Sequence, residues 1–64
     1  MFEQYDDIMS IDDVAAALKI GHTQVYRILR SGQLNGYKEG KDWKIAKLAL
    51  ENYVREKSKV PLIY

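Results

Sequence analysis

The residues best suited to chemistry in this chain form one group of polar side chains between residues 22 and 30. All can make hydrogen bonds, and they are His22, Thr23, Gln24, Tyr26, Arg27 and Arg30. The planar ends of Gln24 and Arg27 match the edges of adenine and guanine in two-point contacts worth about 1 to 3 kcal/mol of discrimination. Thr23 can approach a thymine methyl group or a phosphate, and His22 near a helix N-terminus is placed for phosphate contact. A polar helix face that meets only water is the alternative, and Tyr26 could equally stack on a neighbouring hairpin.

A second group consists of three lysines around Gly40: Lys38, Lys41 and Lys44. Lysines on a hairpin suit contact with phosphates or with the minor groove. Charged side chains on an exposed hairpin edge also prevent strand-to-strand aggregation, so this alternative stays open.

Catalytic chemistry has no comparable set of residues. The chain has no cysteine, and its one histidine, His22, has no obvious carboxylate neighbour in the sequence. The missing cysteines exclude zinc fingers, redox motifs and disulfide scaffolds, and a lone histidine cannot assemble a metal site. A chain this short buries only about 60% of its unfolded surface, which is too little for a deep substrate pocket. We expect no enzyme, no metal and no cofactor.

Charge is divided unevenly along the 64 residues, which carry a net charge of +1. Residues 1–18 have a charge of −5, and the rest of the chain has +6. Such asymmetry indicates a basic surface for nucleic acid, or a dipolar surface that serves only solubility. No apolar run reaches the roughly 18 residues of a membrane span, and residues 1–7 are acidic where a signal peptide is basic. We expect a cytoplasmic chain that forms one domain over residues 1–64, with a core at 9–57 and a tail at 58–64.

Two helices joined by a short turn must position the first group. Ser10, with Asp13 three residues later, predicts the start of a helix over residues 11–18. A second helix begins after Gly21, keeps Val25, Ile28 and Leu29 on one face, and ends before Gly32. Only residues 19–21 separate the helices, so they must pack at a steep angle.

The lysines belong to a predicted hairpin, with strands at 37–39 and 43–45 on either side of residues 40–42. Trp43 and Ile45 share a face that can meet the core, and Lys38 and Lys44 should point to the other side. Trp43, Tyr37 and Tyr53 are expected in the core. A third helix is predicted over about 47–57.

The order of these elements resembles the small winged helix-turn-helix domains of bacterial and phage excisionases and MerR-type regulators. The resemblance covers residues 9–54 and rests on Ser-Ile-Asp-Asp-Val-Ala at 10–15, Val-Tyr-Arg at 25–27, Arg-Ser-Gly-Gln-Leu at 30–34, Lys38, Gly40, Trp-Lys-Ile at 43–45, Leu50 and Tyr53. The chain departs from the pattern at Lys19, where glycine is usual in the turn, at Gly21, where serine or threonine is usual as the cap, and at Glu39 and Ala46. A left-handed backbone at Lys19 would cost on the order of 1 to 2 kcal/mol.

The resemblance implies a mainly α fold with a small β-hairpin that binds double-stranded DNA, with the second helix in the major groove and the hairpin as a wing on the backbone. It implies an excisionase-like recombination factor that assists an integrase, a small transcriptional regulator, or a phage DNA-packaging module, and it does not separate these. A protein-interaction adaptor with the same fold is a further alternative. Leu48 and the apolar tail at 58–64 suggest self-association, or a tail that folds back over the core.

Overall fold

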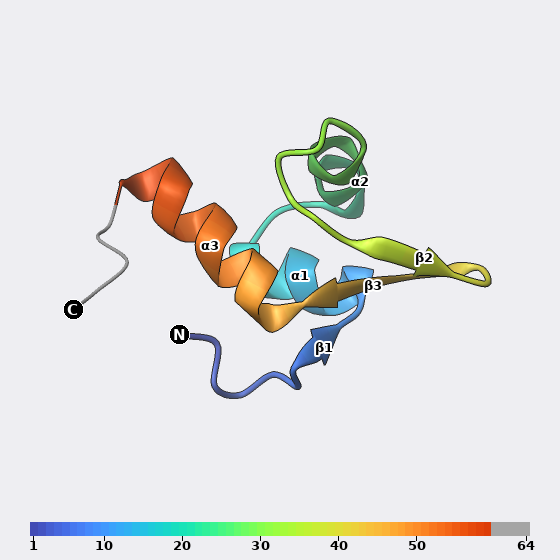
Figure 1. The fold of residues 1–64 in the computed structure, drawn as a ribbon, viewed down its shortest axis with the longest axis horizontal. Coiled ribbons are helices and arrows are strands. Elements are labelled where there is room, and N and C mark those ends of the chain that lie inside the picture. Colours follow the sequence, from blue (N-terminus) through green and yellow to red (C-terminus); the bar gives the residue numbers. More distant parts are fainter. Residues whose placement is uncertain (60–64) are drawn as a thin grey trace.

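A computed structural model describes residues 1–59 of the chain. The elements follow in the order β1 (Ile8–Met9), α1 (Ile11–Leu18), α2 (His22–Arg30), β2 (Tyr37–Glu39), β3 (Asp42–Ala46) and α3 (Lys47–Ser58), as Figure 1 shows. This arrangement confirms the predicted winged helix-turn-helix. Most of the tail, residues 60–64, lies outside the described residues, so both expectations for it stay predictions.

The first helix begins as its capping residues predict. The Ser10 hydroxyl accepts a hydrogen bond from the Asp13 amide at 3.1 Å, and the Asp13 carboxylate accepts one from the Ser10 amide at 3.2 Å. This reciprocal pair satisfies two amides that the first turn of a helix leaves without partners. The start of α1 is therefore fixed by side chains of its own sequence.

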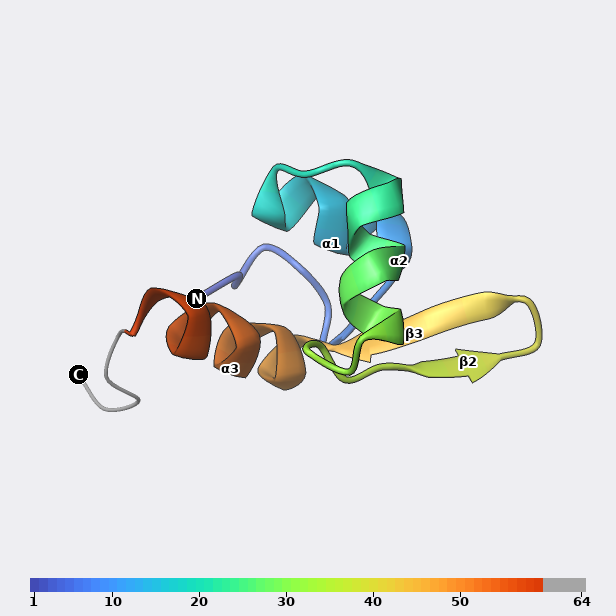
Figure 2. The ribbon, with the colours of Figure 1, turned by 90° about the horizontal axis from the view of Figure 1, so that it is seen from above.

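The turn between α1 and α2 contains the strain expected at Lys19. Its backbone is left-handed, with φ 58° and ψ 45°, and it ends α1. The next residue, Ile20, donates its amide to the Ala15 carbonyl at 3.0 Å, which closes the turn. Gly21 then begins α2 with no side-chain cap, as its lack of a side chain requires. Figure 2 shows the two helices crossing steeply above the sheet.

The sheet has one strand more than predicted. Its order is β1-β3-β2, and both neighbouring pairs are antiparallel. The extra strand, β1, pairs Met9 with Ile45, and both of these side chains are fully buried. A strand of two residues has too short a pattern to be recognised in the sequence.

The hairpin register corrects two predictions. Glu39 pairs with Asp42, so the turn has two residues rather than three. Shifting one strand by one residue turns its side chains to the other face of the sheet. Lys38 therefore pairs with Trp43 and shares its face instead of pointing away from it, and Tyr37 pairs with Lys44 on the opposite face. Tyr37 is 51% exposed, so its prediction as a core residue was wrong.

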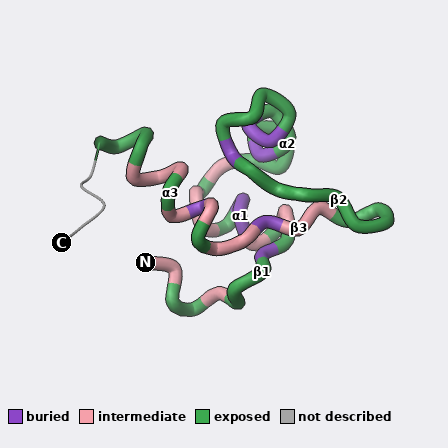
Figure 3. Tube along the Cα trace, viewed as in Figure 1, coloured by how far each residue is buried: buried purple, intermediate pink, exposed green. Residues whose placement is uncertain are grey.

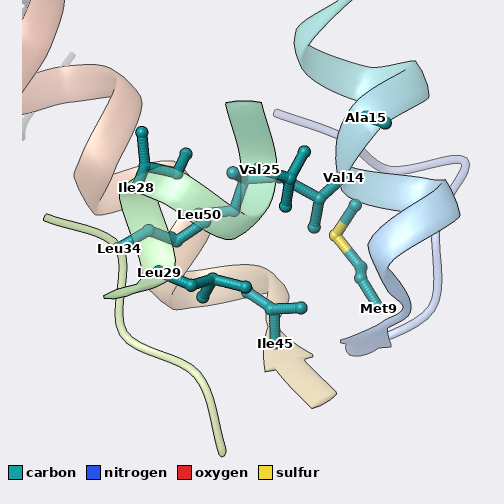
Figure 4. Packing of buried hydrophobic residues seen from close by; sticks show 9 residues of the cluster. All are labelled: Met9, Val14, Ala15, Val25, Ile28, Leu29, Leu34, Ile45 and Leu50. Atoms are coloured by element: carbon teal, nitrogen blue, oxygen red, sulfur yellow. The ribbon is translucent and has the colours of Figure 1, made fainter. Parts of the chain in front are cut away.

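The core draws on every helix and on the sheet. Figure 4 shows the nine buried side chains of this cluster: Met9, Val14, Ala15, Val25, Ile28, Leu29, Leu34, Ile45 and Leu50. Trp43 and Tyr53 are partly buried against this cluster, close to their predicted positions. Figure 3 shows that burial is concentrated near α1, α2 and the base of β3, whereas the far end of the hairpin is exposed. The core thus fixes the inner face of α2 and leaves its outer face to solvent.

Candidate nucleic-acid interface

Helix α2 separates its apolar and polar residues onto different faces. Val25, Ile28 and Leu29 are buried, with at most 7% of each side chain exposed. All six polar residues predicted for a binding surface are exposed: His22, Thr23, Gln24, Tyr26, Arg27 and Arg30. Because the buried side is fixed by the core, these six side chains are held on a helix that cannot rotate about its axis.

Gln24 and Arg27 are joined on this exposed face. The Arg27 Nη1 atom donates a hydrogen bond to Gln24 Oε1 at 3.2 Å. The residues are three apart, which places them next to each other on a helix surface. The contact holds two planar groups together, each of which can bind a base edge at two points.

Tyr26 and Arg30 form a second exposed pair. The Arg30 guanidinium lies 5.7 Å from the centroid of the Tyr26 ring, within the range of a cation–π contact. Tyr26 also lines a cleft between α2 and the hairpin. Its ring therefore lies beside the wing at one edge, and it helps to hold the last charged side chain of α2.

The cleft between α2 and the hairpin has a volume of about 380 Å³. Its walls come from the start of α1, from His22 and Tyr26 on α2, and from residues 41–44 of the hairpin. Lys41 and Lys44 contribute positive charge there, and Asp12 and Asp42 contribute negative charge. A cleft of this kind can bind an anion only where the positive charge of its lysines exceeds the negative charge of its two carboxylates.

The three hairpin lysines lie in different surroundings. Lys41 is exposed in the turn beside the cleft, and Lys44 is half-buried. Lys38 is exposed on the Trp43 face of the hairpin but does not line the cleft. The cleft thus brings Lys41 and Lys44 to His22 and Tyr26, whereas Gln24 lines a separate apolar groove between the α1–α2 turn and α3.

His22 has a carboxylate neighbour that the sequence did not reveal. Its Nε2 atom lies 2.5 Å from Asp12 Oδ1, so the expectation that no carboxylate approaches it was wrong. Asp12 is ten residues away in the chain, and only the steep crossing of α1 and α2 brings the first turns of the two helices together. Asp12 therefore joins the candidate site.

The acidic N-terminal segment lies away from this interface. In Figure 1, residues 1–7 run on the side of the sheet and α3 that is opposite α2. There the N-terminal amine hydrogen-bonds to the Glu3 carboxylate and holds the pKa of Glu3 below its usual value. The fold thus separates the carboxylates of residues 1–7 from α2, whereas Asp12 stays at the cleft beside His22.

Residues 1–59 contain neither a metal-binding cluster nor a membrane-spanning helix. No group of three or more His, Cys, Asp and Glu side chains in this part of the chain could hold a metal ion. None of the helices described there is long and apolar enough to cross a membrane.

Comparison with known proteins gives one match. A family model described as a helix-turn-helix domain matches residues 8–58, which include every helix and strand described above. No curated protein and no solved structure matches the chain significantly.

Proposed function

Because the chain belongs to the helix-turn-helix domain family, we propose that it binds double-stranded DNA sequence-specifically. Helix α2 enters the major groove, and the β2–β3 hairpin acts as a wing on the adjacent backbone. A DNA-binding fold follows from the family, and the roles of individual residues given below are our proposal.

One observation carries the proposal, namely the separation of faces on α2. Its apolar residues are buried in the core, and Thr23, Gln24 and Arg27 are exposed together on a helix of nine residues. Helices that present such donors and acceptors to the major groove can distinguish all four base pairs. The joined Gln24 and Arg27 side chains suit this task, since each can make a two-point contact with one base.

The remaining charged residues suit the phosphate backbone. His22 and Arg30 lie at the two ends of α2, and Tyr26 lies beside the wing. In the hairpin, Lys38, Lys41 and Lys44 supply positive charge for the strand that passes the wing. Phosphate contacts fix the register of a protein on DNA, whereas base contacts select the sequence.

The biological role we propose is that of an excisionase-like recombination factor or a small transcriptional regulator in the cytoplasm of a bacterium or phage-infected cell. A module of this size buries about 600 to 1,000 Å² on DNA, which gives limited affinity for one copy. A second contact is therefore required, from an integrase, from the transcription machinery or from another copy of this chain. Leu48, which is 65% exposed at the start of α3, is our candidate for self-association.

Selection from a random pool of duplexes, followed by mobility shifts over a range of salt concentrations, tests the proposal. We expect one enriched sequence and, for five or six neutralised phosphates, a slope of log affinity against log salt near about −5. Equal affinity for the selected and a scrambled duplex would contradict sequence-specific binding. Failure to bind any duplex at low salt would favour the adaptor alternative, for which Arg27→Ala and Lys41→Ala should leave partner binding intact.

A further inference from the structure

We propose that Asp12 is a positioning residue for DNA binding. Its carboxylate holds the His22 imidazole beside the cleft between α2 and the hairpin, where the protonated ring donates a hydrogen bond to one DNA phosphate. The inference rests on the proposed function and adds a pH dependence to it.

The contact between the two side chains is direct. His22 Nε2 lies 2.5 Å from Asp12 Oδ1, and the side chains are 59% and 86% exposed, respectively. Both residues line the cleft, so the pair stands in the region that a backbone strand between α2 and the wing would cross. The reciprocal bonds of Ser10 and Asp13 fix the first turn of α1 and thereby the position of Asp12.

The chemistry of the two groups sets the proton requirement. An ionised carboxylate only accepts hydrogen bonds, so Nε2 must be the donor to Asp12. In a neutral imidazole the other nitrogen, Nδ1, is then an acceptor and cannot donate to a phosphate. In the protonated ring both nitrogens donate, so His22 can bind Asp12 and a phosphate at once only when it carries a charge.

Other charged groups also line the cleft. Lys41, Asp42 and Lys44 line it from the hairpin, and Tyr26 lies one turn further along α2. Among side chains, only histidine ordinarily changes charge between about pH 5 and 8, and the chain has a single histidine. The N-terminal amine lies with Glu3 and 3.9 Å from Glu51, not at the cleft.

A different role for Asp12 would give the opposite pattern. A carboxylate near DNA repels phosphates, and removal of its charge would then strengthen binding equally at every pH. A positioning role instead predicts that removal of the carboxylate reduces the gain in affinity at acid pH, because the ring is no longer held beside the cleft. The two roles can therefore be separated by the pH profile and not by affinity at a single pH.

The experiment measures affinity for the selected duplex between about pH 5.5 and 8 for the wild type, His22→Gln and Asp12→Ala. We expect wild-type affinity to rise about threefold to tenfold toward the acid end, as one charge-assisted contact forms. Its salt slope should steepen by about 0.9, the value of one more phosphate. His22→Gln should lose both changes, and Asp12→Ala should lose most of the gain in affinity at acid pH, because the imidazole is no longer held beside the cleft. Both substitutions are at exposed positions, and circular dichroism checks that each variant folds.

Each other outcome overturns the inference. A pH-independent wild type, or a His22→Gln variant that keeps the pH dependence, would remove His22 from the phosphate contact while DNA binding stands. An Asp12→Ala variant that keeps the full gain in affinity at acid pH would leave Asp12 with no positioning role. A wild type that binds no duplex at any pH would overturn the proposed function together with the inference.

Discussion

Three factors set the positions of the Gln24 and Arg27 side chains: the helix period, the packed core and a contact between the two side chains. The period places Arg27 on the face opposite the buried Val25 and Leu29 and Gln24 at the edge of that face, and the 3.2 Å hydrogen bond from Arg27 Nη1 to Gln24 Oε1 then restricts both side chains. A restricted side chain loses less conformational entropy when it binds a base. For the base contacts proposed above, the pair therefore needs less ordering than two free side chains would.

Replacement of Gln24 by alanine tests base recognition at this scale. We expect Gln24→Ala to lose about 1 to 3 kcal/mol of discrimination at one base pair of the selected site, because alanine cannot make the two-point contact. The salt slope should stay unchanged, since no charge is removed. Mobility shifts with duplexes altered one base pair at a time measure both quantities. Uniform weakening across the whole panel would assign Gln24 a structural role instead.

The sequence predicted which residues of α2 are exposed but not the faces of the hairpin. A helix face follows from spacing alone, and α2 has a clear apolar stripe. In a hairpin the faces depend on the length of the turn, and Glu39 pairing with Asp42 moved Lys38 and Tyr37 to faces opposite to those predicted. The Asp12–His22 contact could not be predicted because it exists only after two helices have packed.

At the scale of elements, the three helices were predictable because each has its own signals. Ser10 and Asp13 begin α1, and Gly32, with a left-handed φ of 84°, follows the end of α2. Strand β1 has no such signal, since its two residues depend on pairing with β3. Elements that are stabilised by their own sequence were found, and an element stabilised only by its neighbour was missed.

The turn between α1 and α2 offers a test of stored strain. Lys19 adopts φ 58°, which costs a non-glycine residue about 1 to 2 kcal/mol. We expect Lys19→Gly to raise the free energy of unfolding by about 0.5 to 1 kcal/mol, because the greater entropy of unfolded glycine offsets part of the relief. The matched control is Gln33→Gly, at an exposed loop position without a positive φ, which should lower stability. Urea unfolding measures both, and equal destabilisation would contradict strain at Lys19.

At the scale of the whole molecule, charge and apolar exposure occupy different places. The acidic N-terminal segment lies opposite α2, while Ile8, Tyr37 and Leu48 are the most exposed large apolar residues of those described. A molecule of this kind can face DNA with one side and leave another for a protein contact. The sequence indicated the charge division, but the fold places only residues 1–7 of the acidic part opposite α2 and leaves Asp12 beside His22.

Self-association through Leu48 is testable at this scale. We expect Leu48→Lys to self-associate at least about tenfold more weakly than the wild type, since burial of one leucine contributes about 1.5 to 3 kcal/mol. Gln33→Lys adds the same charge at another exposed position and serves as the control. Sedimentation equilibrium over a range of concentrations measures the change. Two variants that associate as the wild type does would exclude Leu48 from the contact.

The central claim is that the exposed face of α2 binds DNA bases, and one comparison tests it most directly. The affinity for the selected duplex is measured for the wild type, Arg27→Gln and Lys59→Gln. Lys59 is an exposed cation after α3 that lines neither the cleft nor the groove beside Gln24, so its replacement removes the same charge elsewhere. We expect Arg27→Gln to lose about tenfold or more, as the loss of one two-point contact requires. Lys59→Gln should bind within about twofold of the wild type, as expected for a charge outside the interface. Equal losses in the two variants would show that only net charge matters, and would contradict recognition by α2.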